Sequence, residues 1–121
     1  MSRVLQKKLQ DDYEEYITAQ KEFQRAISLK TQLDGQLKVN QSVKDELIIL
    51  KEDAELYKLI GPVLIKQDLG EARVNVDKRM EYISNEMKRV ENHISACENK
   101  QASFQEKITK TKAELAKMEA K

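Results

Sequence analysis

The feature that most restricts the fold of this chain is a seven-residue repeat of apolar side chains in its C-terminal half. Two interleaved series follow this spacing: Val76, Ile83, Val90, Cys97, Phe104, Thr111 and Met118, and Met80, Met87, Ile94, Gln101, Ile108 and Leu115. The intervening positions are mostly Lys, Glu, Asn, Gln and Ser. A narrow apolar stripe that keeps this spacing over about six repeats is typical of a coiled-coil helix. We call this stripe the seam, and we expect a helix over about residues 68–120.

The N-terminal half carries a weaker version of the same repeat, and its apolar stripe is also called the seam. Its apolar positions are Leu5, Leu9, Tyr16, Ala19, Phe23, Ala26, Leu33, Leu37 and Leu47. Asp12, Lys30, Asn40 and Lys44 interrupt this seam, and Gly35 costs about 1 kcal/mol relative to alanine inside a helix. Because lysine stems can lie along apolar surface with the ammonium group in water, we still expect a helix over about residues 2–50.

Between the two repeats the pattern changes from helical to β. The segments 55–60 and 63–66 are rich in β-branched and aromatic residues, and Gly61-Pro62 separates them. Gly suits the first central position of a type II′ turn and Pro the second, so a β-hairpin is predicted over residues 55–66. An irregular loop is the alternative. Asp68 and Glu71 have the spacing of a capping box, which predicts the start of the second helix.

These elements predict a mainly α fold, a long antiparallel two-helix coiled-coil hairpin with one short β-hairpin at the bend. Residues 1–121 would form a single unit. The two helices have similar lengths at 1.5 Å per residue, so they can fold back on each other from the bend. Leu5 and Leu9 would then face the region of Leu115 and Ile108, and both helix ends would form one tip.

Composition narrows the functional classes. A net charge of +1, from 22 Lys and Arg against 21 Asp and Glu, provides no basic field for nucleic acid. No apolar run approaches the roughly 20 residues that span a bilayer, and the first residues lack the features of a secretory signal. We therefore expect an intracellular protein that does not enter membranes. Without Trp and with two Phe, the core is thin, which points to stabilisation by partner chains.

Catalytic or metal-binding chemistry has few candidates. The only histidine, His93, precedes the only cysteine, Cys97, by one helical turn. Two such ligands are too few for a structural zinc site, so we interpret Cys97 as a small core residue. Glycines at positions 35, 61 and 70 do not form a phosphate-binding loop. We expect no enzymatic activity, no cofactor and no metal.

The middle of the chain resembles a known family. Residues 56–73 read LYKLIGPVLIKQDLGEAR and residues 76–83 read VDKRMEYI, and both segments resemble prefoldin subunits of the beta class. The resemblance implies a hexamer of two alpha-class and four beta-class subunits, whose hairpins build a central double β-barrel. It also implies a cytoplasmic co-chaperone that holds unfolded proteins such as actin and tubulin at its coiled-coil tips. The resemblance further implies delivery of these clients to the cytosolic group II chaperonin without the use of ATP.

Three sets of residues are assigned roles on this basis. An isolated two-stranded hairpin is marginal in water, so its apolar residues are predicted to form the subunit interface: Leu56, Tyr57, Leu59, Ile60, Val63, Leu64 and Ile65. Contacts with clients or the chaperonin at the tips are predicted for Leu5, Leu9, Leu115 and Met118. The coiled-coil core is predicted to contain Phe23, Leu37, Ile83, Val90, Ile94, Cys97, Phe104 and Ile108.

Two other functions remain open at this level. One is a coiled-coil adaptor that holds partners at a fixed spacing, although such a rod needs no apolar hairpin in its middle. The other is membership of a prefoldin-like scaffold complex. The lysines near the C-terminus either form a basic rim for acidic partners or simply solvate a helix end and favour its dipole. We expect the isolated chain to be poorly stable or self-associated, because its hairpin would be uncovered.

Overall fold

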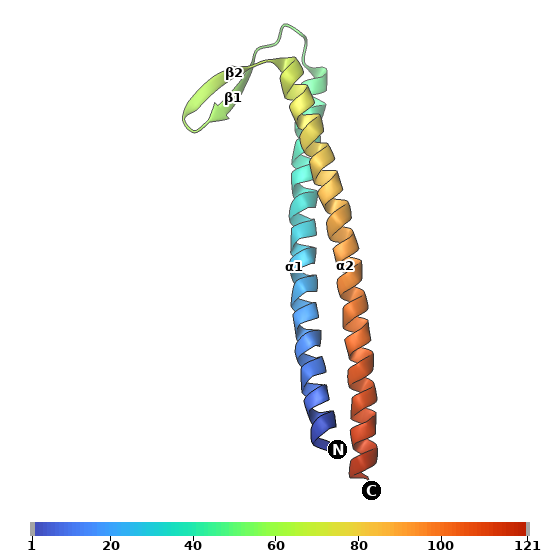
Figure 1. Ribbon diagram of the computed structural model, residues 1–121. Helices are drawn as coiled ribbons and strands as arrows, with labels where there is room; N and C mark the ends of the chain where they lie inside the picture. The colour runs from blue at the N-terminus through green and yellow to red at the C-terminus, as the bar shows by residue number, and fades with distance from the viewer. Residues whose placement is uncertain (1, 121) are drawn as a thin grey trace. The chain divides into compact units, whose positions relative to one another are not determined.

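The computed structural model describes residues 2–120 and contains two long helices joined by a β-hairpin. In chain order the elements are α1 (Ser2–Ile49), β1 (Leu56–Ile60), β2 (Val63–Gln67) and α2 (Leu69–Glu119) (Figure 1). The predicted fold class, mainly α with a single β-hairpin between two long helices, is confirmed. Contacts between residues divide the chain into two compact units, a terminal unit and a central unit.

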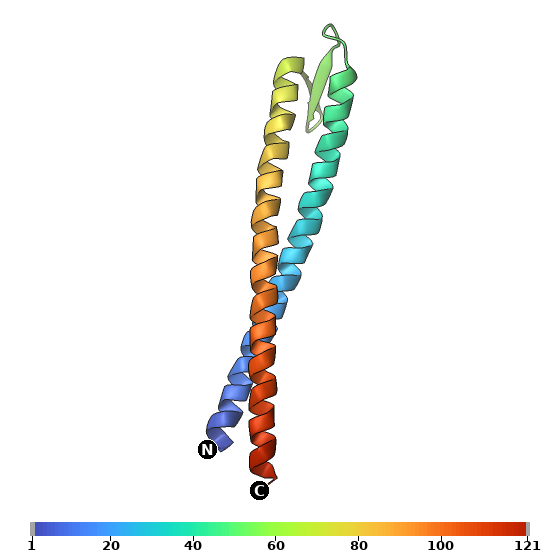
Figure 2. The same ribbon diagram turned by 90° about the vertical axis from the view of Figure 1, so that its right-hand side faces the viewer.

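The terminal unit consists of the first part of α1 and the second part of α2, that is, the described residues up to Lys30 and from Arg89 onward. The two helices are antiparallel here. Gln101 Nε2 lies 3.4 Å from the carbonyl oxygen of Ala19, while Lys30 Nζ lies 3.8 Å from Glu91 Oε1. As a result, the start of α1 and the end of α2 lie at the same end of this unit (Figures 1 and 2).

The seam forms the core of the terminal unit. Its most enclosed side chains come from both helices: Ala19, Ala26, Val90, Ile94, Cys97, Ile108 and Thr111. Polar residues in the seam find partners on the opposite helix, since Gln101 donates to the Ala19 carbonyl and Lys30 lies beside Glu91. A polar seam residue with a defined partner favours one register over its alternatives.

The central unit spans Thr31–Lys88 and contains the hairpin. Its core lies where α1 ends and α2 begins, and it is a cluster of Leu47, Leu69, Ala72 and Val76, with Leu50, Leu56 and Met80 packed against it. Lys44 Nζ lies 3.0 Å from Asp77 Oδ1, and these side chains are 39% and 58% exposed, so solvent screens this ion pair and it contributes at most about 1 kcal/mol to stability. Leu56 attaches the first residue of β1 to the helical core.

The C-terminal end of α1 and the N-terminal end of α2 are capped by different side chains. Arg73 Nη2 donates to the carbonyl oxygens of Leu47 at 2.8 Å and Leu50 at 3.1 Å, and Arg73 Nε donates to Leu47 at 3.1 Å. These bonds supply partners and positive charge to the end of α1, whose own last turn has no basic residue. At the start of α2, the backbone N–H of Glu71 donates to Asp68 Oδ2 at 2.9 Å, which confirms Asp68 as the predicted N-cap.

Candidate assembly surface on the β-hairpin

The hairpin predicted between the helices is present and pairs in one simple register. β1 and β2 are antiparallel, and the register runs from Leu56 opposite Gln67 to Ile60 opposite Val63. The loop is Gly61-Pro62, with φ of +57° at Gly61 and no positive φ at any other residue that the structure describes. Positive φ followed by negative φ is the pattern of a type II′ turn, whose twist matches that of the strands.

The two faces of the hairpin both carry exposed apolar side chains. On one face Leu59 lies opposite Leu64, and these side chains are 68% and 64% exposed. On the other face Ile60 lies opposite Val63 and Ile65 opposite Lys58. Exposed apolar surface of this extent on a small sheet is typical of a protein–protein interaction site.

Of the seven residues predicted for the interface, six are exposed: Tyr57, Leu59, Ile60, Val63, Leu64 and Ile65. Leu56 lies differently, because its side chain packs against the helical core of the central unit. The sheet has two strands, so each strand has one edge with unpaired backbone groups. Such edges can accept additional strands.

A cavity of about 290 Å³ lies between the hairpin and the helices of the central unit. Val43, Tyr57, Leu59 and Arg79 are among its lining residues. Nearby on α1, Ile48 and Ile49 are 60% and 80% exposed. The heptad repeat does not predict a role for these two residues. Their position outside the repeat, at the end of α1, nevertheless indicates that they face outward.

The residues predicted at the tips all lie in the terminal unit. Leu5, Leu9 and Leu115 are half-buried, and Met118 is 40% exposed. Two lysines near them stack on aromatic rings: Lys112 Nζ lies 5.2 Å from the centre of the Tyr13 ring, and Lys107 Nζ lies 4.9 Å from that of Phe104. These lysines therefore cover aromatic surface in addition to solvating the helix.

The residues predicted for the coiled-coil core lie inward to different degrees. The buried members are Ile83, Val90, Ile94, Cys97 and Ile108. The half-buried members are Phe23, Leu37 and Phe104. Cys97 is 1% exposed, and its Sγ lies 3.7 Å from His93 Nε2, so the neighbouring positions of these two residues in sequence do bring their side chains together.

Among the helices that the structure describes, none is long and apolar enough to cross a membrane. The described fold combines two long helices with a single exposed hairpin, which is the architecture of a beta-class prefoldin chain. A solved structure agrees: the prefoldin beta subunit from Thermococcus strain KS-1 superposes with a TM-score of 0.77, covering 85% of this chain and 90% of that one at 18% identity.

Sequence comparison identifies the family directly. A family model described as Prefoldin subunit matches residues 10–118. Prefoldin subunit 6 of Mus musculus is 38% identical over 120 residues, covering 99% of this chain and 94% of the relative. Prefoldin subunit 6 of Arabidopsis thaliana is 42% identical over 118 residues, covering 98% and 92%.

The class of protein defined by this fold and these relatives is a prefoldin-type co-chaperone subunit. The chain belongs to the prefoldin family. The resemblance to the prefoldin family is thereby confirmed, and over nearly its whole length the chain is similar to prefoldin subunit 6.

Proposed function

We propose that this chain is a beta-class subunit of a hexameric prefoldin in the cytoplasm, with no enzymatic activity and no cofactor of its own. The complex captures unfolded proteins of the actin and tubulin type and delivers them to the cytosolic group II chaperonin. Residues 1–121 act as one functional unit in this role, with the hairpin for assembly and the helix ends for clients.

The observation that carries this proposal is the pair of exposed apolar faces on the hairpin. Burying a Leu, Ile or Val side chain is worth about 1.5–3 kcal/mol. Covering the exposed hairpin residues in a shared barrel therefore contributes a favourable free energy on the order of 10 kcal/mol. This gain is comparable to the free-energy cost of bringing the subunits together. Strand pairing at both edges adds main-chain hydrogen bonds and fixes the orientation of each neighbour.

Client capture is assigned to the end of the terminal unit. Half-buried Leu5, Leu9 and Leu115 and the more exposed Met118 offer adaptable apolar surface. Unfolded chains share exposed apolar segments but no common shape, so flexible side chains such as methionine suit their recognition. This surface needs no nucleotide, because holding and releasing a client depends on binding equilibria.

The test is the native mass and composition of the complex that co-purifies with the tagged chain from cytosol. We expect a discrete assembly of several different small coiled-coil subunits. The double variant Leu59→Asp, Ile65→Asp places a charge on each face of the hairpin and should abolish that assembly. Val39→Asp is the matched control, because Val39 is as exposed as Leu64, at 64%, but lies on α1 outside the hairpin.

A lone dimer, or one large unrelated partner retained by the Leu59→Asp, Ile65→Asp variant, would contradict the proposal and favour a coiled-coil adaptor. A discrete assembly whose other members are not prefoldin subunits would instead assign the chain to a prefoldin-like scaffold.

A further inference from the structure

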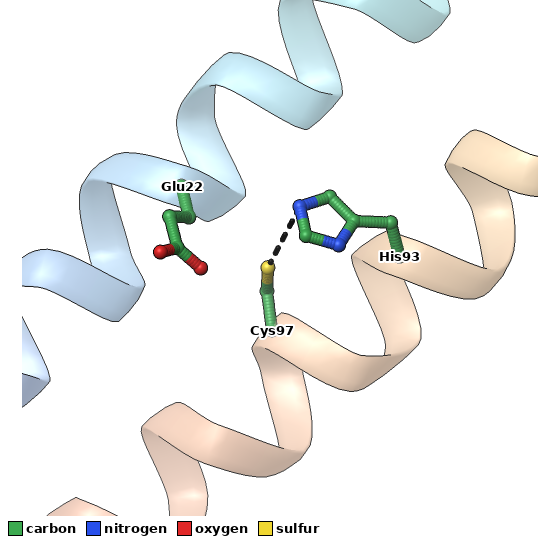
Figure 3. Close-up of side chains that lie close together, drawn as sticks. All are labelled: Glu22, His93 and Cys97. Atoms are coloured by element: carbon green, nitrogen blue, oxygen red, sulfur yellow. Dashed lines mark hydrogen bonds between the residues drawn. The ribbon is translucent and has the colours of Figure 1, made fainter.

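Three side chains with metal-binding atoms meet between the two helices of the terminal unit. Figure 3 shows Glu22 on α1 directed toward His93 and Cys97 on α2. One atom from each, a Glu22 carboxylate oxygen, a His93 ring nitrogen and Cys97 Sγ, all lie within 4.8 Å of one another. We propose that these three residues form a zinc-binding site that joins α1 to α2.

The spacing of the ligand atoms suits zinc. Tetrahedral zinc has Zn–S bonds of about 2.3 Å and Zn–N bonds of about 2.0 Å, which places a sulfur and a nitrogen ligand about 3.5 Å apart. The separation of Cys97 Sγ and His93 Nε2 is already 3.7 Å. Because the three ligand atoms lie within 4.8 Å of one another, the carboxylate has to approach by at most about 1.3 Å to reach zinc-binding distances, a movement that rotation about the side-chain bonds of Glu22 can supply.

The types of ligand also favour zinc over other common metals. Calcium and magnesium prefer oxygen ligands throughout, whereas copper(I) prefers thiolate and imidazole without a carboxylate. Zinc accepts sulfur, nitrogen and oxygen together. A thiolate and a carboxylate balance the charge of one Zn²⁺ ion, and binding releases the thiol proton of Cys97 to solvent.

Cys97 Sγ and His93 Nε2 are hydrogen-bonded to each other, and metal binding replaces this contact. Glu22 is half-buried, and within residues 2–120 its carboxylate forms no hydrogen bond or ion pair. Cys97 is buried in the seam and His93 is exposed, so the site has an enclosed thiol and an open side. Three protein ligands with a water molecule in the fourth position complete the coordination.

In the sequence, His93 and Cys97 are two ligands on one helix, which are too few for a zinc site. The missing third ligand comes from the opposite helix, and its signal was the antiparallel register. With Ala19 opposite Gln101, the next turn of α1 carries Glu22 to the level of Cys97. The site therefore depends on the pairing of the helices and not on any motif within one of them.

The experiment is titration of the untagged full chain with Co²⁺, which replaces zinc and has visible and near-ultraviolet spectra. Because the chain contains one cysteine, a thiolate-to-cobalt charge-transfer band reports on Cys97 alone. We expect this band to saturate at one ion per chain and to disappear when Zn²⁺ is added. The variants Glu22→Gln, His93→Gln and Cys97→Ala should each lose saturable binding.

Glu15→Gln is the matched control, because Glu15 occupies the same heptad position one repeat earlier on α1 and is exposed. It should leave the titration unchanged. Circular dichroism of each variant verifies that the helices still form, and His93→Gln, at an exposed position, keeps the test valid if Cys97→Ala fails to fold. A second readout is thermal unfolding, in which Zn²⁺ should raise the midpoint of the wild-type chain but not that of Glu22→Gln.

Absence of the thiolate band would overturn the proposal. So would a band that persists in Glu22→Gln, since the two helices would then not share the metal. Binding that Glu15→Gln weakens as much as Glu22→Gln does would indicate general attraction to acidic helix surface, and this result would also overturn the site.

Discussion

Arg73 on α2 donates two hydrogen bonds to the carbonyl oxygen of Leu47 on α1, at 2.8 Å from Nη2 and 3.1 Å from Nε. Leu47 is also buried in the core of the central unit. A single residue of α1 therefore packs against α2 through its side chain and is capped by α2 through its backbone. This contact holds the end of α1 beside the start of α2, on either side of the hairpin.

Replacing Arg73 with alanine should destabilise the central unit by about 1.5–3 kcal/mol, because charge-assisted hydrogen bonds to partly buried carbonyls are lost. Arg73→Lys should recover only part of this, since an ammonium group cannot reproduce the guanidinium fork. Denaturant unfolding of the assembled protein, followed by circular dichroism, measures the effect. Arg79→Ala is the control at an exposed position on α2, and equal losses in the two variants would contradict this role of Arg73.

Gly35→Ala should stabilise the protein by about 0.5–1 kcal/mol. Gly35 is exposed within α1, and a Cβ atom built on it meets nothing within 4 Å, so the change removes backbone freedom from the unfolded chain without a clash. The thermal unfolding midpoint should rise. Gly61→Ala should have the opposite sign although space is also available there, because Gly61 has φ of +57°. A gain in stability at both positions would show that the turn does not require glycine.

Asp12→Leu should stabilise the terminal unit by about 1 kcal/mol or more. Asp12 lies in the N-terminal seam, and its Oδ2 atom is buried without a hydrogen-bond partner among the described residues. Leucine at this position removes that cost and adds apolar contact. Asp11→Leu is the control, since Asp11 is exposed, and unfolding experiments should show little change for it. An unchanged or lower stability for Asp12→Leu would contradict the prediction, because the unpaired carboxylate oxygen would then carry no measurable cost.

The double variant Leu115→Ser, Met118→Ser should weaken client capture without affecting assembly. These residues provide apolar surface at the end of α2, whereas the hairpin lies in the central unit. The measurement is suppression of actin aggregation on dilution from denaturant, with native mass confirming an intact complex. The Leu59→Asp, Ile65→Asp variant should instead lose the assembled complex, as measured by native mass. Full client protection by the Leu115→Ser, Met118→Ser variant would remove these two residues from the proposed contact surface.

Much of the fold was predictable because its signals are local and periodic. The seven-residue repeat predicted both helices and their inward-facing positions, including buried Ala19, Ala26 and Leu33 in the weaker half. The Gly61-Pro62 pair predicted the hairpin and the turn type, because positive φ is a property of glycine itself. Asp68 predicted the start of α2, since an N-cap depends on residues only three positions apart.

The residues that sequence reasoning placed differently depend on distant partners. Leu56 was expected at the interface together with the rest of the hairpin, but the core of the central unit draws its side chain inward. The sequence around Arg73 indicates only a resemblance to the family, because its hydrogen bonds to Leu47 and Leu50 form only once both helices are in place. For the same reason, the sequence alone does not place Glu22 beside Cys97.

The sequence by itself determined where the helices, the turn and the apolar seam lie, because backbone propensity, turn chemistry and side-chain periodicity act over a few residues. Only the tertiary structure decided which groups meet across the helices: the cap of α1 by Arg73, the contact of Gln101 with Ala19, and the grouping of Glu22 with His93 and Cys97. These contacts depend on the register and rotation of one helix against the other, and differences of a few ångströms in that pairing determine whether two side chains touch.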